Sequence, residues 1–158
     1  MRRTGIALMS LTLALTLTAC GAGFNASTRQ VKQVADGVEG AITSDGNKIK
    51  VLNVLVVETA EGAGVLVATI VNDLPVEDAL LGVAINGAVA TVTGTNSLPQ
   101  NSPISFEGAT ANAKAVVPVL NAKAGEHVQV TMFFAHAGEI TVLALVRAQS
   151  DTYAGITA

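Results

Sequence analysis

The sequence predicts a single all-β domain of about seven short strands, arranged as a sandwich or a small barrel. Aliphatic and β-branched runs recur at a spacing of roughly 8 to 12 residues, and turn-forming residues separate them. No helical period of useful length follows residue 20. With no Trp, four Phe and one Tyr, the core must be built from Val, Ile, Leu and Ala, and the β-branched members of that set favour strands.

The first 19 residues have the composition of a secretory signal. Arg2 and Arg3 supply a positive start, an apolar segment runs from residue 5 to residue 18, and small residues precede Cys20. The apolar run of about 14 residues is shorter than the roughly 20 that a helix needs to cross a bilayer core. We therefore interpret residues 1–19 as a cleaved signal peptide and not as a permanent membrane span.

The segment Leu17-Thr18-Ala19-Cys20 resembles a bacterial lipobox at all of its positions. The resemblance implies cleavage between Ala19 and Cys20 and acylation of the Cys20 thiol. The alternative is an ordinary secretory signal that happens to contain a cysteine. One acyl chain gives only marginal membrane binding, whereas two or more make a durable anchor. We therefore expect an exported lipoprotein that Cys20 holds on the outer face of the cytoplasmic membrane.

Removal of the signal leaves 139 residues, in which seven Lys and Arg face twelve Asp and Glu, for a formal charge of −5. This length suits one domain with one core. Nucleic acid and anionic lipid surfaces both require clustered cations, so neither is expected as the main partner. Cys20 is the only cysteine, so the acylated chain has no thiol left for a disulfide, and packing must stabilise the domain.

Three segments organise the chain after the signal. Residues 20–46 are rich in Gly, Ala, Ser, Asp and Gln without a sustained apolar period, which predicts a lipidated N-terminus and a flexible tether. Residues 47–148 contain the expected strands. Residues 149–158 form a polar, small-residue tail that we expect to fray.

The expected strands are β-branched runs bounded by polar or turn-forming residues. They cover residues 48–57, 65–72, 79–85, 88–93, 112–120, 127–135 and 139–147. Asn86-Gly87 tolerates the positive φ that a two-residue type I′ hairpin turn requires. Residues 95–105 contain two prolines and predict a loop with at most an edge strand, and Pro118 places its own strand at an edge or bulge.

Several stretches of the expected sheet carry a family resemblance. They are Ile49–Val54, Val67–Asp73, Asp78–Val83, Ala124–Glu126 and Ala137–Val142. On these stretches, residues 47–147 resemble the periplasmic copper chaperones of the PCu(A)C group and, more closely, the LpqE-like lipoproteins of actinobacteria. Cys20-Gly21-Ala22-Gly23 matches the start of the mature lipoprotein. The resemblance implies a cupredoxin-like or immunoglobulin-like β-sandwich.

The resemblance also implies a copper site built from a first His, a Met several residues on, and a later His-x-Met. Imidazole and thioether ligands of this kind suit Cu(I). No such ligand stands near Val89–Thr91, where the first His would fall, or near Lys114–Val116, where His-x-Met would fall. The sequence therefore predicts that the family's copper site is absent.

His127, Met132 and His136 are the His and Met residues that follow the signal. Alternation along a strand points His127 and Met132 to opposite faces. Met132 and His136 share a face but lie roughly 13 Å apart at about 3.3 Å per residue, unless the chain bends near Ala135. We interpret Met132 as a core residue and His136 as a solvated turn residue. A displaced metal site on these three side chains remains an alternative.

No catalytic motif is present. The Gly-x-Ser-x-Gly elbow of serine hydrolases is missing. The adjacent Glu77-Asp78 and the pair Glu58 with Glu61 are interpreted as solvated loop carboxylates. Lys114 and Lys123 are interpreted as solubilising charges beside strands.

The sequence therefore predicts a membrane-anchored, non-enzymatic binding or accessory module that needs no cofactor. Its expected partner, besides the membrane that the lipid enters, is an envelope protein or a small ligand. The alternative is a chaperone for copper or another metal, with a displaced site near Met132 and His136.

Overall fold

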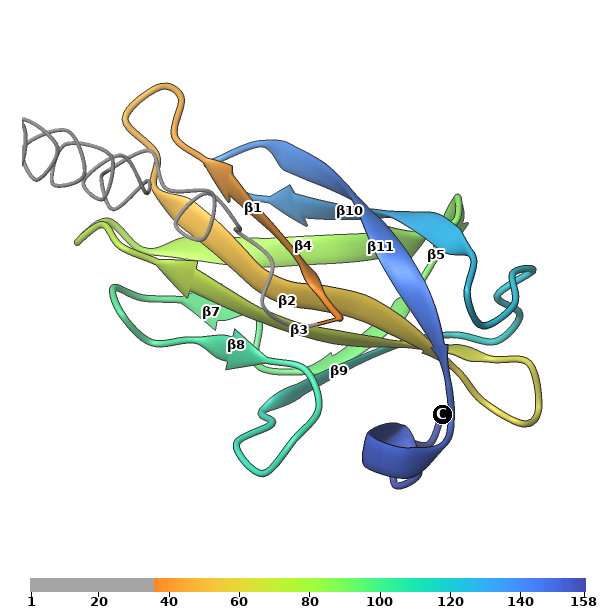
Figure 1. The fold of residues 1–158 in the computed structure, drawn as a ribbon. Helices are drawn as coiled ribbons and strands as arrows, with labels where there is room; N and C mark the ends of the chain where they lie inside the picture. Colours follow the sequence, from red (N-terminus) through yellow and green to blue (C-terminus); the bar gives the residue numbers. More distant parts are fainter. Residues whose placement is uncertain (1–35) are drawn as a thin grey trace, which may run out of the picture. The chain divides into compact units, whose positions relative to one another are not determined.

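The computed structural model describes residues 36–158, which form an all-β domain (Figure 1). The signal peptide, Cys20 and the first part of the expected tether lie outside these residues. The strands are β1 (Val38–Ile42), β2 (Ile49–Glu58), β3 (Gly64–Asn72), β4 (Asp78–Ile85), β5 (Ala88–Val89), β6 (Thr91–Gly94), β7 (Ser97–Leu98), β8 (Ile104–Ser105), β9 (Ala113–Val117), β10 (His127–Phe134) and β11 (Glu139–Ala148), followed by one 3-10 turn at Asp151–Tyr153. None of the helical structure in residues 36–158 is long and apolar enough to cross a bilayer.

One short extended segment joins the two edges of the sheet. The main strand order is β5-β4-β10-β11-β2-β3-β9-β6, and β5 and β6 are successive parts of residues 88–94. β5 pairs with β4, the Ala90 N–H donates to the Val83 carbonyl at 2.9 Å, and β6 then pairs with β9. The sheet therefore curls into a nearly closed, barrel-like structure (Figure 1). This confirms the all-β prediction, and of the expected sandwich and small barrel the structure is closer to the barrel.

The structure contains more strands than the seven predicted. Every predicted run contains a strand, but residues 88–93 divide into β5 and β6 at Ala90. β7 and β8 are two-residue strands inside the predicted loop 95–105, where Leu98 and Ile104 are fully buried. β9 ends at Val117, immediately before the proline that cannot donate to the ladder. Short edge pairings of this kind leave almost no periodic signal in a sequence.

β1 corrects the expected tether, because it places residues 38–42 inside the folded domain. It pairs antiparallel with the first half of β2, from Ile42 against Ile49 to Val38 against Val54. Its sequence, Val-Glu-Gly-Ala-Ile, is only five residues long and has a central glycine, so no sustained apolar pattern marked it. The glycine has a packing role, since a Cβ at Gly40 would lie 2.8 Å from Ile140 Cδ1.

A bulge at Asn53 reverses the side-chain alternation of β2. Asn53 has φ of 51°, and the pairing of β2 with β3 shifts between Leu52 and Leu55. An extra residue in one strand exchanges the inward and outward sets beyond it. Val51 and Val54 both face the interior as a result, and residues 54–57 are buried on both faces of the sheet.

The outer face of β2 and β3 carries a second apolar cluster. Leu55, Val57 and Val65 pack there against Ile156 of the C-terminal segment, which is only 9% exposed. The tail at 149–158 was expected to fray, and this expectation is wrong. The composition of the tail is polar and does not single out Ile156. This one side chain covers the apolar surface of Leu55 and Val57, which the bulge turns outward.

The Asn86-Gly87 turn confirms the strongest local prediction of the sequence. The two residues have φ of 52° and 80°, and Ile85 pairs with Ala88 on either side. Both central residues of a type I′ turn require positive φ, which asparagine and glycine accept at low cost. The turn starts the segment that closes the sheet.

We predict that Phe106→Ala lowers the free energy of unfolding by about 3–5 kcal/mol, because Phe106 is a fully buried side chain of the main core and its loss leaves a cavity. Urea denaturation followed by circular dichroism measures this change. Val89→Ala is the control, since Val89 is 81% exposed, and we expect less than about 0.5 kcal/mol there. Equal effects of the two substitutions would contradict the assigned core.

Candidate functional site

The two places where the family's copper ligands would fall lie beside each other in the sheet. β6 pairs with β9, so that Thr91 lies opposite Val116 and Thr93 lies opposite Lys114. The side chains at these places are Val89, Ala90 and Thr91 on one strand segment and Lys114, Ala115 and Val116 on the other. None of them is an imidazole or a thioether. These residues therefore do not fit a Cu(I) ion.

The structure does not bring His127, Met132 and His136 together. His127 is exposed at the start of β10, whereas Met132 is fully buried in the main core. The His136 side chain is 68% exposed in the turn between β10 and β11. The two interpretations made from sequence, Met132 as a core residue and His136 as a solvated turn residue, agree with these positions. Among residues 36–158 no group of three or more His, Cys, Asp or Glu side chains is placed to hold a metal ion.

Asp78 is a buried carboxylate that ties two turns together. Its Oδ1 accepts the N–H groups of Ala79 at 2.7 Å and His136 at 2.9 Å, and its Oδ2 accepts that of Ala137 at 2.9 Å. The His136 Nδ1 lies 3.4 Å from Oδ1. Glu77-Asp78 was expected to face water, and for Asp78, 5% exposed, this expectation is wrong. Its role is to fix the β10–β11 turn against the start of β4.

The contacts of Asp78 lower its pKa. Burial acts to raise the pKa, but the backbone N–H groups of Ala79, His136 and Ala137 and the charge of His136 together hold it below its ordinary value. A depressed pKa in the folded state stabilises the fold above the unfolded pKa. The contribution is lost as the pH falls through the folded pKa.

We predict that Asp78→Asn costs roughly 1–3 kcal/mol of folding free energy at pH 7, because the amide cannot accept the three N–H groups as well as the carboxylate does. The variant should also lose less stability than the parent as the pH falls below about 4. Urea unfolding at pH 7, 5, 4 and 3 measures both effects. Glu77→Gln, the exposed neighbour, is the control. Parallel curves for Asp78→Asn and the parent would contradict the assigned role.

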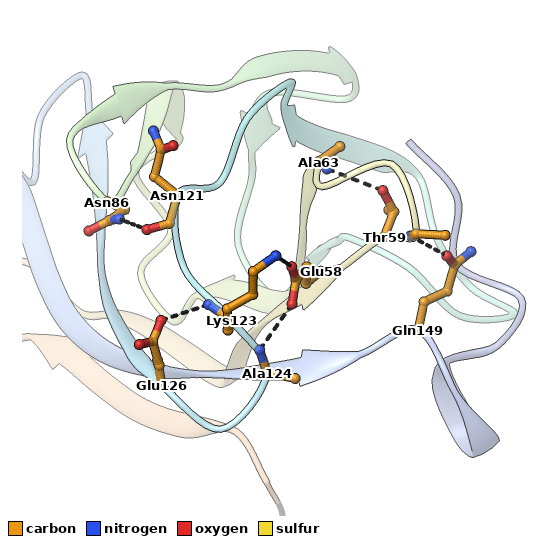
Figure 2. Close-up of polar contacts among 10 residues, drawn as sticks. Glu58, Thr59, Ala63, Asn86, Asn121, Lys123, Ala124, Glu126 and Gln149 are labelled. Atoms are coloured by element: carbon orange, nitrogen blue, oxygen red, sulfur yellow. Dashed lines mark hydrogen bonds and ion pairs between the residues drawn. The ribbon is translucent and has the colours of Figure 1, made fainter.

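A polar network joins the loops at the other end of the sheet (Figure 2). Lys123 Nζ contacts Glu58 Oε1 at 2.6 Å, and the Ala124 N–H donates to Glu58 Oε2 at 3.0 Å. Glu126 Oε2 accepts the Lys123 N–H at 2.7 Å, and Asn86 Nδ2 donates to the Leu120 carbonyl at 3.2 Å. The network holds the long loop between β9 and β10 onto the β2–β3 and β4–β5 hairpins.

Glu58 and Lys123 form an asymmetric pair. The Glu58 side chain is 14% exposed and that of Lys123 is 80% exposed. The hydrogen bond from Lys123 is the main cause that lowers the pKa of Glu58, against the opposing effect of burial, and the same bond raises the pKa of Lys123. Sequence reasoning took both as solvated charges and missed the pair, which joins residues 65 positions apart. In the sequence, Ala124–Glu126 marked this loop only as one of the stretches that carry the family resemblance.

An open hollow of about 330 Å³ lies beside this network. Glu58, Val119, Asn121, Lys123 and Glu126 contribute to its lining. Val119 is 60% exposed. This loop end therefore offers a partner a mixed surface, with an ion pair and an exposed apolar side chain.

The fold defined by these strands is that of PCuAC domains. No protein-family model and no curated protein matches the chain. The copper-bound PCuAC domain from PmoF2 superposes with a TM-score of 0.56 and 23% identity, covering 70% of this chain and 98% of that chain. The apo PCuAC domain from PmoF1 gives a TM-score of 0.54 and 22% identity, covering 63% and 93%. At this identity the likeness shows the fold, and it supports the copper-chaperone resemblance at the level of structure.

Proposed function

We propose that the chain is a membrane-anchored, non-enzymatic binding module of the cell envelope, built on a PCuAC-like domain that no longer carries the family's His and Met ligands. The pairing of β6 with β9 carries the proposal. Through Thr91, which lies opposite Val116, the stretch Val89–Thr91 comes next to the stretch Lys114–Val116, and neither stretch contains a His or a Met. The partner is an envelope protein or a small ligand, and nucleic acid is disfavoured by the charge of the mature chain.

The lipobox supplies the other half of the proposal. Leu17-Thr18-Ala19-Cys20 ends an apolar segment at the only thiol of the chain, so acylation of Cys20 would tether the domain to the outer face of the cytoplasmic membrane. We also propose that the chain is a lipoprotein of the LpqE-like kind, because the lipobox and Cys20-Gly21-Ala22-Gly23 match the start of such a mature lipoprotein. β1, the first strand of residues 36–158, begins at Val38, so 17 residues of the chain separate it from Cys20.

We predict that Cys20→Ala moves the protein from the membrane fraction to the soluble exported fraction, because the thiol that would carry the acyl chains is gone. Membrane fractionation with immunodetection measures the shift. Ser27→Ala, downstream of the lipobox, is the matched control and should stay membrane-bound. Unchanged membrane binding of Cys20→Ala, with a normal thermal unfolding curve, would contradict the anchor.

The copper-chaperone alternative has a direct test of its own. We predict that the full-length chain carrying Cys20→Ala binds Cu(I) no more tightly than micromolar in a competition titration with a chromogenic Cu(I) chelator, since Met132 is buried and the side chains of His127 and His136 are exposed elsewhere. His136→Ala should leave the titration unchanged. Tighter binding that His136→Ala abolishes would establish a displaced copper site instead.

A further inference from the structure

The C-terminal segment covers one side of a pocket of about 520 Å³ on the outer face of the sheet. Asn53 and Val67 come from β2 and β3, Glu107 and Gly108 follow β8, and residues 152–156 turn back after β11 (Figure 1). A volume between about 300 and 1,000 Å³ is usual for small-molecule sites. No pattern in the sequence marks the pocket, because four segments that are separate in the chain make it.

Specific contacts hold the C-terminal segment over the pocket. The Gln149 side chain, drawn in Figure 2, accepts the Ala60 N–H at 3.0 Å. It also donates to the Ile156 carbonyl at 2.6 Å. Arg147 lies over the Tyr153 ring at 5.9 Å and pairs with Asp36 at 3.3 Å. The wall formed by residues 152–156 is therefore fixed to the sheet at both of its ends.

The lining divides into an apolar side and a polar side. Val67, Tyr153 and Ile156 supply the apolar surface, and Ile156 belongs to the second cluster. Asn53, Glu107 and Thr152 supply an amide, a carboxylate and a hydroxyl. Glu107 is the charged member of this lining, and it forms no ion pair with the cations of residues 36–158.

Of two lining residues with positive φ, Glu107 holds a backbone conformation that is costly for its residue type. Asn53 has φ of 51° and Glu107 has φ of 67°. Asparagine accepts this region, but glutamate does so rarely, and non-glycine residues held there are concentrated at functional sites. Phe106, fully buried beside it, and Gly108, with φ of 102°, constrain the chain on either side of Glu107. The fold thereby holds Glu107 in the lining of the pocket.

We propose that this pocket binds a small amphipathic amine, with its apolar body against Val67, Tyr153 and Ile156 and its ammonium group toward Glu107. The inference rests on the proposed function, since it names the small ligand of the binding module. An anionic ligand would meet an uncompensated carboxylate, and a purely apolar ligand would leave the carboxylate, amide and hydroxyl without partners.

Three probes of matched size separate the chemistry: 4-phenylbutylamine, 4-phenylbutanol and 4-phenylbutanoate. We predict that the amine shifts the amide resonances of the pocket residues in NMR titrations of the full-length Cys20→Ala chain. It should bind roughly two- to fivefold more tightly than the alcohol, the size expected for a partly exposed ion pair, and the carboxylate should bind most weakly. Equal binding of amine and carboxylate, or shifts confined to another face, would overturn the proposal.

Two variants localise the effect. Glu107→Gln should make the amine bind no better than the alcohol. Gly155→Phe should block the pocket, because a Cβ at Gly155 meets nothing within 4 Å and its backbone needs no positive φ. Gly82→Phe on β4, where a Cβ also meets nothing within 4 Å, is the matched control. Full amine binding by Glu107→Gln or by Gly155→Phe, with unfolding curves like that of the parent, would overturn the proposal.

The outcome is independent of the membrane anchor. A failed amine titration with a normal Cys20→Ala fractionation result removes the ligand and leaves the anchored module. Retained membrane binding of Cys20→Ala together with amine binding at the pocket removes the anchor and leaves the ligand site.

Discussion

The bulge at Asn53 is the constraint on which the rest of the domain depends. Up to Val54, β2 pairs with β1, and from Leu55 it pairs in parallel with β11. The added residue reverses the alternation of β2, so Leu55 and Val57 face outward although Val54 and Val56 face the core. Each buried aliphatic side chain contributes about 1.5–3 kcal/mol through apolar burial. The outward pair therefore needs a cover, and the C-terminal segment supplies it.

The same bulge lies in close contact with the backbone at Gly37, just before β1. A Cβ at Gly37 would lie 2.3 Å from the Asn53 carbonyl carbon, so only glycine fits where the chain enters β1. Asp36 next to it reaches Arg147 and Tyr153. The entry of the chain, the bulge and the C-terminal segment thus form one connected region, and each fixes the others.

The long strands were predictable from the sequence because their β-branched runs alternate or stay apolar over eight to ten residues, as in β2 and β10. The Asn86-Gly87 turn was predictable because its chemistry is local. β1 was not, since its five residues gain stability only by pairing with β2. The burial of Ile156 was not predictable either, because it depends on the bulge at Asn53, which exchanges the inward and outward side chains of β2. Local chemistry is visible in a sequence, whereas the face that a strand presents after a bulge is not.

The candidate sites also differ in whether the sequence alone reveals them or whether distant segments of the fold form them. The absence of His and Met near Val89 and Lys114 is a property of the sequence, so it was visible before the structure. The pairing of β6 with β9, with Thr91 opposite Val116, then brought the two stretches together. Glu58 with Lys123, and Asp78 with the β10–β11 turn, join distant segments and were misread as solvated charges.

Glu107 belongs to a site that distant segments of the fold form. Its chain neighbours contain no motif, and its position at a pocket arises because β8 pairs with β3 and the C-terminal segment returns to β2. β6 and β9 carry no His or Met where they pair, and the hollows of residues 36–158 include one beside Glu58 and one beside Glu107. The second hollow has the more distinct chemistry, because it sets the carboxylate of Glu107, which forms no ion pair within residues 36–158, against an aliphatic and aromatic wall. That combination distinguishes an amine from an alcohol or an acid, which a mixed surface with its charges already paired does not.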